Sequence, residues 1–138
     1  MSGLNAFFKK NKKERATVKY AASKDFVDEE GKVMEWEIRP LKSKEADRIR
    51  EECTSIEAKG KKVAVDNGKF NRMVAAACTI YPDLKNAELQ ESYGVLGADN
   101  LIQELLDNDG EYQQYCKKVL EISGYEVNDG ELVEEAKN

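Results

Sequence analysis

The feature that most constrains this chain is the segment from Ile80 to Tyr125, where apolar residues recur at helical spacing between short breaks. Pro82, Gly94 and the Asn108–Gly110 triplet mark the breaks. The densest apolar cluster of the segment consists of Val95, Leu96, Leu101, Ile102, Leu105 and Leu106. An apolar stripe of this kind is buried by packing against other helices. The segment therefore predicts a helical packing unit with little catalytic chemistry of its own.

Two further helices are predicted before this segment. Ser43 offers an N-cap for a helix running from Lys44 to about Glu57, and Asp66 or Asn67 offers one for a helix that Pro82 stops. Residues 58–62 are rich in glycine and lysine and predict a loop. In the later segment, the expected helices are 86–93, which ends at Gly94, a stretch around 101–106, and a last helix that closes at Gly124.

The region before Pro40 has a different period. Residues 17–20 and 33–39 alternate between apolar and polar side chains, and a polar turn containing Gly31 separates them. This pattern predicts a β-hairpin with Met34, Trp36 and Ile38 on one face. A lone hairpin is marginal in water, so helices or another subunit must cover that face. We expect an α+β, mainly α, fold: an N-terminal β-hairpin followed by a compact bundle of about four to five helices. Residues 1–125 would form one domain and residues 126–138 an acidic, flexible tail.

Charge excludes some classes of function. The chain has 138 residues, a net charge of −5 and 36% charged residues, which does not suit a general nucleic-acid binder. The local exception is a basic run near the N-terminus, which we interpret as a solvated terminus rather than a phosphate-binding arm. No stretch approaches the roughly 18 apolar residues of a membrane span. The short apolar patch at Leu4, Phe7 and Phe8 precedes the lysines, unlike a signal peptide, so we expect a cytoplasmic protein.

The residue types argue against catalysis and metal binding. The chain has no histidine, which removes the usual partner of a nucleophilic cysteine. Cys53, Cys78 and Cys116 are scattered within helical patterns, and we interpret them as small hydrophobic residues. The acidic run 107–111 does not space its oxygens as a calcium-binding loop does. We therefore expect no enzyme, no cofactor and no metal site.

Exposed apolar residues are the better candidates for function. Phe7 and Phe8 have no neighbours in the sequence that could bury them, so they are the first candidates for a partner contact. Tyr93, Leu96 and Tyr112 are further candidates, because tyrosine rings are common at interfaces. Whether these three residues point into the core or toward a partner is left open by the sequence. An exposed strand edge also makes a homo-oligomer plausible.

Short motifs in a fixed order give the chain a resemblance to a known family. They are Lys19-Tyr20-x-x-Ser23, the strand Trp36-Glu37-Ile38-Arg39, and Tyr81-Pro82-Asp83-Leu84 followed by the run from Leu89 to Gly94. From about Leu4 to Tyr125, and most loosely across 58–69, the chain resembles the XkdN-like phage tail assembly chaperones.

The resemblance implies a non-enzymatic protein of a tailed phage or prophage, from a Gram-positive host. Such a chaperone binds the tape measure protein and keeps it soluble in the host cytoplasm while the tail tube assembles. It is absent from the mature virion, and a form extended by a translational frameshift would be a further partner. The alternatives are a structural component of the tail or baseplate and, less in keeping with the residues, a small enzyme.

Overall fold

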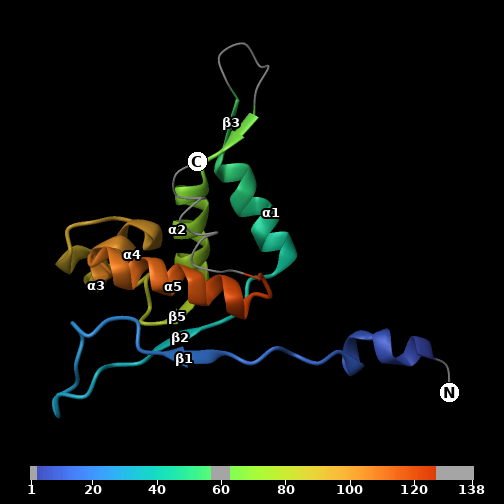
Figure 1. Cartoon of the computed structure of the whole chain (residues 1–138), viewed down its shortest axis with the longest axis horizontal. Coiled ribbons are helices and arrows are strands. Elements are labelled where there is room, and N and C mark those ends of the chain that lie inside the picture. The colour runs from blue at the N-terminus through green and yellow to red at the C-terminus, as the bar shows by residue number, and fades with distance from the viewer. Residues whose placement is uncertain (1–2, 57–62, 127–138) are drawn as a thin grey trace.

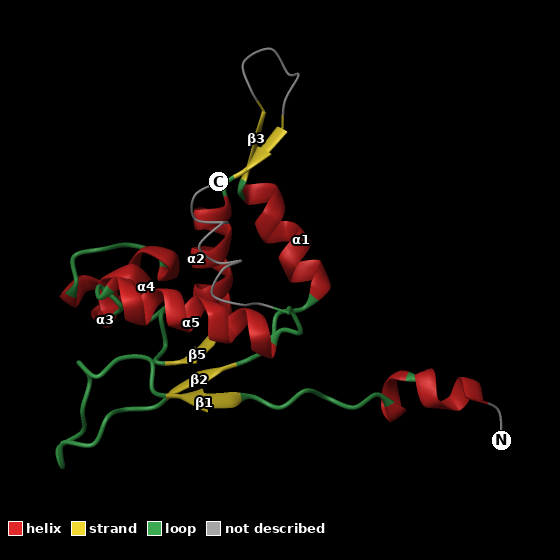
Figure 2. Cartoon of the chain, viewed as in Figure 1, coloured by secondary structure: helices red, strands yellow, loops and turns green. Residues whose placement is uncertain are grey.

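The computed structural model describes residues 3–56 and 63–126 and contains, within these ranges, five α-helices and two small antiparallel sheets. Figure 1 shows the helices gathered on one side of the N-terminal sheet, and Figure 2 shows how strongly helix predominates. The expected class, α+β and mainly α with an N-terminal hairpin, is confirmed. The helices are α1 (Ser43–Glu52), α2 (Asn67–Cys78), α3 (Ala87–Ser92), α4 (Ala98–Leu105) and α5 (Asp109–Ile122).

The N-terminal sheet has one strand more than the sequence predicted. The expected hairpin is present as β1 (Val18–Tyr20) and β2 (Trp36–Ile38). The other side of β2 pairs with β5 (Thr79–Tyr81), so the order is β1-β2-β5. The prediction that the second helix continues to Tyr81 is therefore wrong. The helix ends at Cys78 because the next residues become extended and bond to β2.

A second hairpin extends from the ends of α1 and α2. It consists of β3 (Thr54–Ile56) and β4 (Val63–Val65), so the prediction of a helix as far as Glu57 is also wrong. The helix α1 ends at Glu52, and Thr54 Oγ1 donates a hydrogen bond to the Arg50 carbonyl in its last turn (2.6 Å). The loop predicted for 58–62 and nearly all of the predicted tail lie outside the described residues.

Asx side chains begin three of the helices. Asp66, Asn86 and Asn108 each accept a hydrogen bond from the backbone N–H three residues later, as N-caps do. The cap predicted at Ser43 is wrong, because Ser43 is already the first helical residue. Lys42 occupies the cap position and makes no side-chain cap bond. Gly124 follows α5 with a φ of 98°, in agreement with its predicted role at the C-terminus of that helix.

The core lies between the sheet and the helices α2, α4 and α5. Trp36 and Ile38 are almost fully buried and face the helices, as the alternation in the sequence predicted. The helix α2 packs against both α4 and α5 and presents the small buried residues Ala75 and Ala76. All three cysteines are buried and unpaired, which confirms their interpretation as small core residues. Within the described residues, no helix is long and apolar enough to cross a membrane.

Candidate partner-binding surfaces

The N-terminal arm, residues 3–13, is a separate exposed element. It contains two short 3₁₀ helices, Gly3–Phe7 and Lys9–Asn11, and every residue in it is exposed. Phe7 is 82% exposed and Phe8 47% exposed, as expected of an apolar patch without local cover. Figure 1 shows the arm extending away from the body of the molecule beyond β1. That these two rings bind a partner remains a prediction.

The turn between α3 and α4 carries a second apolar surface. Tyr93 is 36% exposed and Leu96 85% exposed, so Leu96, whose direction the sequence left open, faces solvent rather than the core. Gln90 organises the turn: its side-chain nitrogen donates to the Leu84 carbonyl (2.8 Å), and its side-chain oxygen accepts from the Gly97 N–H (3.1 Å). The chain therefore displays Leu96 on an ordered turn.

Tyr112 lies in the core. Its side chain is 9% exposed, and burial raises the pKa of its phenol above the ordinary value. The neighbouring core residues on the same helix are Tyr115, Cys116 and Val119, at spacings that place them on one helical face. Tyr112 is thus outside the exposed surface formed by Tyr93 and Leu96, although the sequence grouped the three together.

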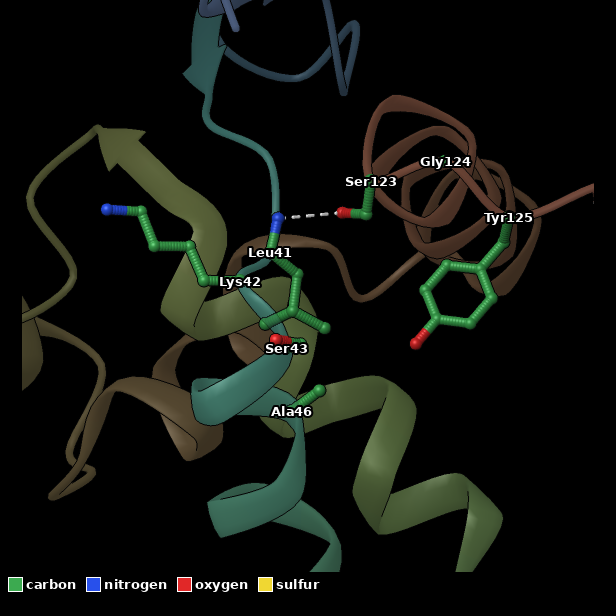
Figure 3. Close-up of a pocket in the computed structure, with 7 residues that line it drawn as sticks. All are labelled: Leu41, Lys42, Ser43, Ala46, Ser123, Gly124 and Tyr125. Atoms are coloured by element: carbon green, nitrogen blue, oxygen red, sulfur yellow. Dashed lines mark hydrogen bonds between the residues drawn. The ribbon is translucent and has the colours of Figure 1, made fainter. Parts of the chain in front are cut away.

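A hollow between the start of α1 and the end of α5 was not predicted. It encloses about 280 Å³ and is lined by Leu41, Lys42, Ser43, Ala46, Ser123, Gly124 and Tyr125. Figure 3 shows that these residues come from two segments that are far apart in the sequence, with Leu41 facing Ser123 and the Lys42 side chain pointing away from the α5 segment. Ser123 joins the two walls, because its hydroxyl accepts from the Leu41 N–H (2.9 Å) and donates to the Val119 carbonyl (2.8 Å). Local patterns could not reveal a site assembled in this way.

The rim of the hollow is basic although the chain as a whole is acidic. Lys42 belongs to the lining, and a nitrogen of Arg15 lies 3.3 Å from the position that a Cβ on Gly124 would take. Arg50 reaches the hydroxyl of Tyr125 (3.4 Å) and also pairs with Asp47 (3.1 Å). Arg15 is also well placed for the partial negative charge at the C-terminus of α5. The hollow thus combines apolar walls with positive charge at its edge.

The thiol groups have the properties of packing residues. Burial raises the pKa of Cys78 and that of Cys116 to about 12, so both remain protonated at neutral pH. In the described part of the chain, no group of three or more Cys, Asp or Glu side chains is arranged to hold a metal ion. What the described surface offers is apolar contact area bordered by charge.

The described part of the chain is a small helical scaffold with exposed apolar side chains at several ordered positions. Residues 4–137 match the family of phage XkdN-like tail assembly chaperone proteins, and the chain belongs to this family. The resemblance inferred from the sequence motifs is therefore confirmed. The general role of the family is in phage tail assembly.

Individual relatives agree with this assignment. The phage-like element PBSX protein XkdN of Bacillus subtilis (strain 168) is 31% identical over 128 residues, covering 91% of this chain and 86% of XkdN. The uncharacterised protein YqbN of the same organism is 30% identical over 128 residues, covering 91% of this chain and 86% of YqbN. The crystal structure of YqbN has a TM-score of 0.78 with this structure at 25% identity, covering 91% of this chain and 99% of that one.

Proposed function

We propose that this chain binds the tape measure protein of its own phage or prophage, and keeps it soluble in the host cytoplasm while the tail tube assembles. The chain acts by binding, without catalysing a reaction, and is absent from the mature virion. The observation that carries the proposal is the match to the tail assembly chaperone family over residues 4–137. The exposed apolar side chains support it, because a chaperone needs apolar contact area on a charged, soluble scaffold.

The hollow between α1 and α5 is a candidate site for a client helix on the described surface. Its volume of about 280 Å³ admits one or two apolar side chains, and Leu41, Ala46 and Tyr125 supply apolar contact. Burying one leucine-sized side chain there contributes about 1.5–3 kcal/mol. The basic rim favours a client segment in which acidic residues flank the apolar one, and disfavours a basic segment.

Co-expression tests the proposal. The tape measure protein from the same gene cluster is expressed with and without this chain, and its soluble fraction and co-purification are measured. We expect this protein to be insoluble alone, and soluble and bound in the presence of the chain. If it stays insoluble and unbound with the chain present, the proposed function is wrong. Mass spectrometry of purified particles separates the chaperone from a structural tail component, which would be present in many copies.

A matched pair of variants tests the hollow separately. Ser43→Trp places an indole at the mouth of the hollow from an exposed position, whereas Lys44→Trp adds the same side chain at an exposed neighbour outside the lining. We expect Ser43→Trp to weaken client binding about tenfold or more, the loss of one buried apolar anchor, and Lys44→Trp to leave it unchanged. Equal binding by the two variants would exclude the hollow as the client site but not the chaperone function.

A further inference from the structure

We propose that the N-terminal arm of one copy docks onto an acidic head on a second copy of the same chain. The acidic head is defined as residues 86–111, which comprise α3, α4, the turn between them and the first turn of α5. This surface is different from the hollow, and the contact involves no tape measure protein. The inference therefore goes beyond the proposed function and does not depend on it.

The arm carries positive charge and exposed phenylalanine rings, and no ion pair joins its lysines to another described residue. Residues 3–13 contain four lysines and no acidic residue, so the arm carries a net charge of +4. The remainder of the chain keeps 18 of the 22 basic residues and all 27 acidic ones, a net charge of −9. Phe7 and Phe8 lie within this basic segment and are exposed. A partner for the arm must therefore be acidic and must offer apolar contact.

The acidic head has the complementary charge. Residues 86–111 contain seven acidic residues and neither lysine nor arginine. Three of the seven are engaged within the molecule: an Asp99 oxygen lies 3.8 Å from Arg72 Nε, Glu111 accepts hydrogen bonds from the Ser23 hydroxyl and the Lys24 N–H, and Asp109 accepts one from the Gln113 side chain (3.4 Å). Five of the seven are exposed to solvent: Glu88, Glu91, Glu104, Asp107 and Asp109. Opposite charge on arm and head would steer the two together and fix their orientation.

The head also supplies the apolar contact. Among the described residues, Leu96 and Phe7 are the two most exposed large apolar side chains, at 85% and 82%. Leu96 and Tyr93 lie on the turn that follows Glu91, and this turn is held by the Gln90 bonds and by the Gly94 N–H bond to the Glu91 carbonyl (2.9 Å). Apolar side chains bordered by acidic ones thus face solvent on the head, matching phenylalanines bordered by lysines on the arm.

The position of the arm favours a second copy over the same molecule. Figure 1, drawn with the longest axis horizontal, shows the arm at one end of the molecule and α3 and α4 toward the other. The arm leaves β1 in the direction away from the head of its own chain. Because arm and head are different surfaces, a single arm–head contact between two copies is heterologous and leaves one arm and one head of the dimer free. Association should therefore continue beyond the dimer as concentration rises.

Two variants with complementary defects test the proposal. The first changes the arm, Phe7→Ser with Phe8→Ser, and keeps the head. The second changes the head, Glu91→Lys with Leu96→Ser, and keeps the arm. All four positions are exposed, so folding should persist, and circular dichroism checks it. The control carries the same kinds of substitution at exposed residues elsewhere, Val27→Ser with Glu30→Lys.

Sedimentation velocity over a range of concentrations is the measurement. We expect the full chain and the control to self-associate, and each defective variant alone to remain monomeric, with a dissociation constant raised tenfold or more. A mixture of the two defective variants should form a dimer that cannot grow, because only one intact arm and one intact head can meet. Raising the salt from about 0.1 M to about 1 M shortens the screening length from about 10 Å to 3 Å and should weaken association.

Three results would overturn the proposal. The first is a full chain that stays monomeric at all concentrations. The second is self-association that persists in both defective variants, which would place the contact elsewhere, for example at a strand edge. The third is a mixture of the defective variants that fails to form a dimer. If the full chain is monomeric and the phenylalanine substitutions instead reduce capture of the tape measure protein, the arm belongs to the client site.

Discussion

The hydroxyl of Tyr115 joins α5 to the strand β5, and its removal makes a quantitative test of the core. Tyr115 is fully buried, and its hydroxyl lies 2.6 Å from Thr79 Oγ1. Thr79 Oγ1 uses its single proton to donate to the Ala75 carbonyl (2.7 Å), so Tyr115 must be the donor in the bond between the two hydroxyls. Burial raises the pKa of Tyr115, which keeps this proton in place throughout the ordinary pH range.

Tyr115→Phe and Thr79→Val should lower the free energy of unfolding by different amounts. Tyr115→Phe removes a donor and leaves Thr79 bonded to Ala75, so we expect a loss of about 1 kcal/mol in the free energy of unfolding. Thr79→Val removes the acceptor and leaves a buried phenolic hydroxyl without a partner, which costs about 1–3 kcal/mol. In the double variant no hydroxyl remains to be satisfied. Its loss should therefore be smaller than the sum of the single losses by about 1 kcal/mol.

Urea denaturation, monitored by circular dichroism, gives the free energy of unfolding of the wild type, the two single variants and the double variant. The dependence of the unfolding free energy on urea should have the same slope in each, since the exposed area does not change. Tyr93→Phe is the matched control, because the ring of Tyr93 is 36% exposed, and it should change the stability by less than about 0.5 kcal/mol. Additive losses, or a Tyr115→Phe loss no larger than that of the control, would refute the assigned donor and the role of this bond.

Three further outcomes follow from single sites. Gly97→Ala should destabilise the fold by about 1–3 kcal/mol in the same urea assay, because Gly97 has a φ of 94° and a Cβ there would lie 3.1 Å from an Asp99 oxygen. The control Gly3→Ala, which has open space around it, should leave the stability unchanged. Hydrogen bonds from Arg39 lower the pKa of Glu45, so its carboxylate stabilises the fold above the ordinary value of about 4.3, and this contribution disappears as the pH falls through the lowered pKa. The stability difference between the wild type and Glu45→Gln, at most about 1 kcal/mol for a pair that is partly exposed to solvent, should therefore shrink on acidification. The buried Cys78 and Cys116, with raised pKa values, should react with a thiol reagent only on unfolding; rapid reaction in native buffer would contradict their burial.

The helices and some of their ends, such as the start of α2 and the end of α5, could be predicted from the sequence because both signals are local. Apolar spacing identified the faces of α2, α4 and α5, Asp66 was identified as a candidate cap of α2, and the helix expected from residue 86 was found as α3. The alternation of apolar and polar side chains likewise predicted the hairpin of β1 and β2, with Trp36 and Ile38 facing the core. These features depend on residues within a few positions of one another.

The strand β5 and the second hairpin could not be predicted in this way. Thr79–Tyr81 is three residues long and follows α2 without a turn, and Tyr81 continues the helical spacing of the residues before it. The deciding interaction is the pairing with Glu37 and Ile38, about 40 positions earlier in the chain. Ile56 likewise fits a helical period as well as a strand, and its pairing with Val63 determines the outcome. Tertiary pairing overrides a local pattern in both cases.

The candidate partner-binding residues also differ in whether a local pattern in the sequence predicts their burial. Tyr112 repeats at helical intervals with Tyr115, Cys116 and Val119, so its burial follows from a pattern present in the sequence. Leu96 has no such pattern: it lies between Gly94 and Gly97, which have φ values of 68° and 94°. Backbone of this kind, rarely adopted by other residues, reverses the chain and carries Leu96 outward, whereas Val95 beside it packs against the core. Two glycines this close together, and not apolar spacing, are therefore the signal that distinguishes a displayed side chain from a core one in such a turn.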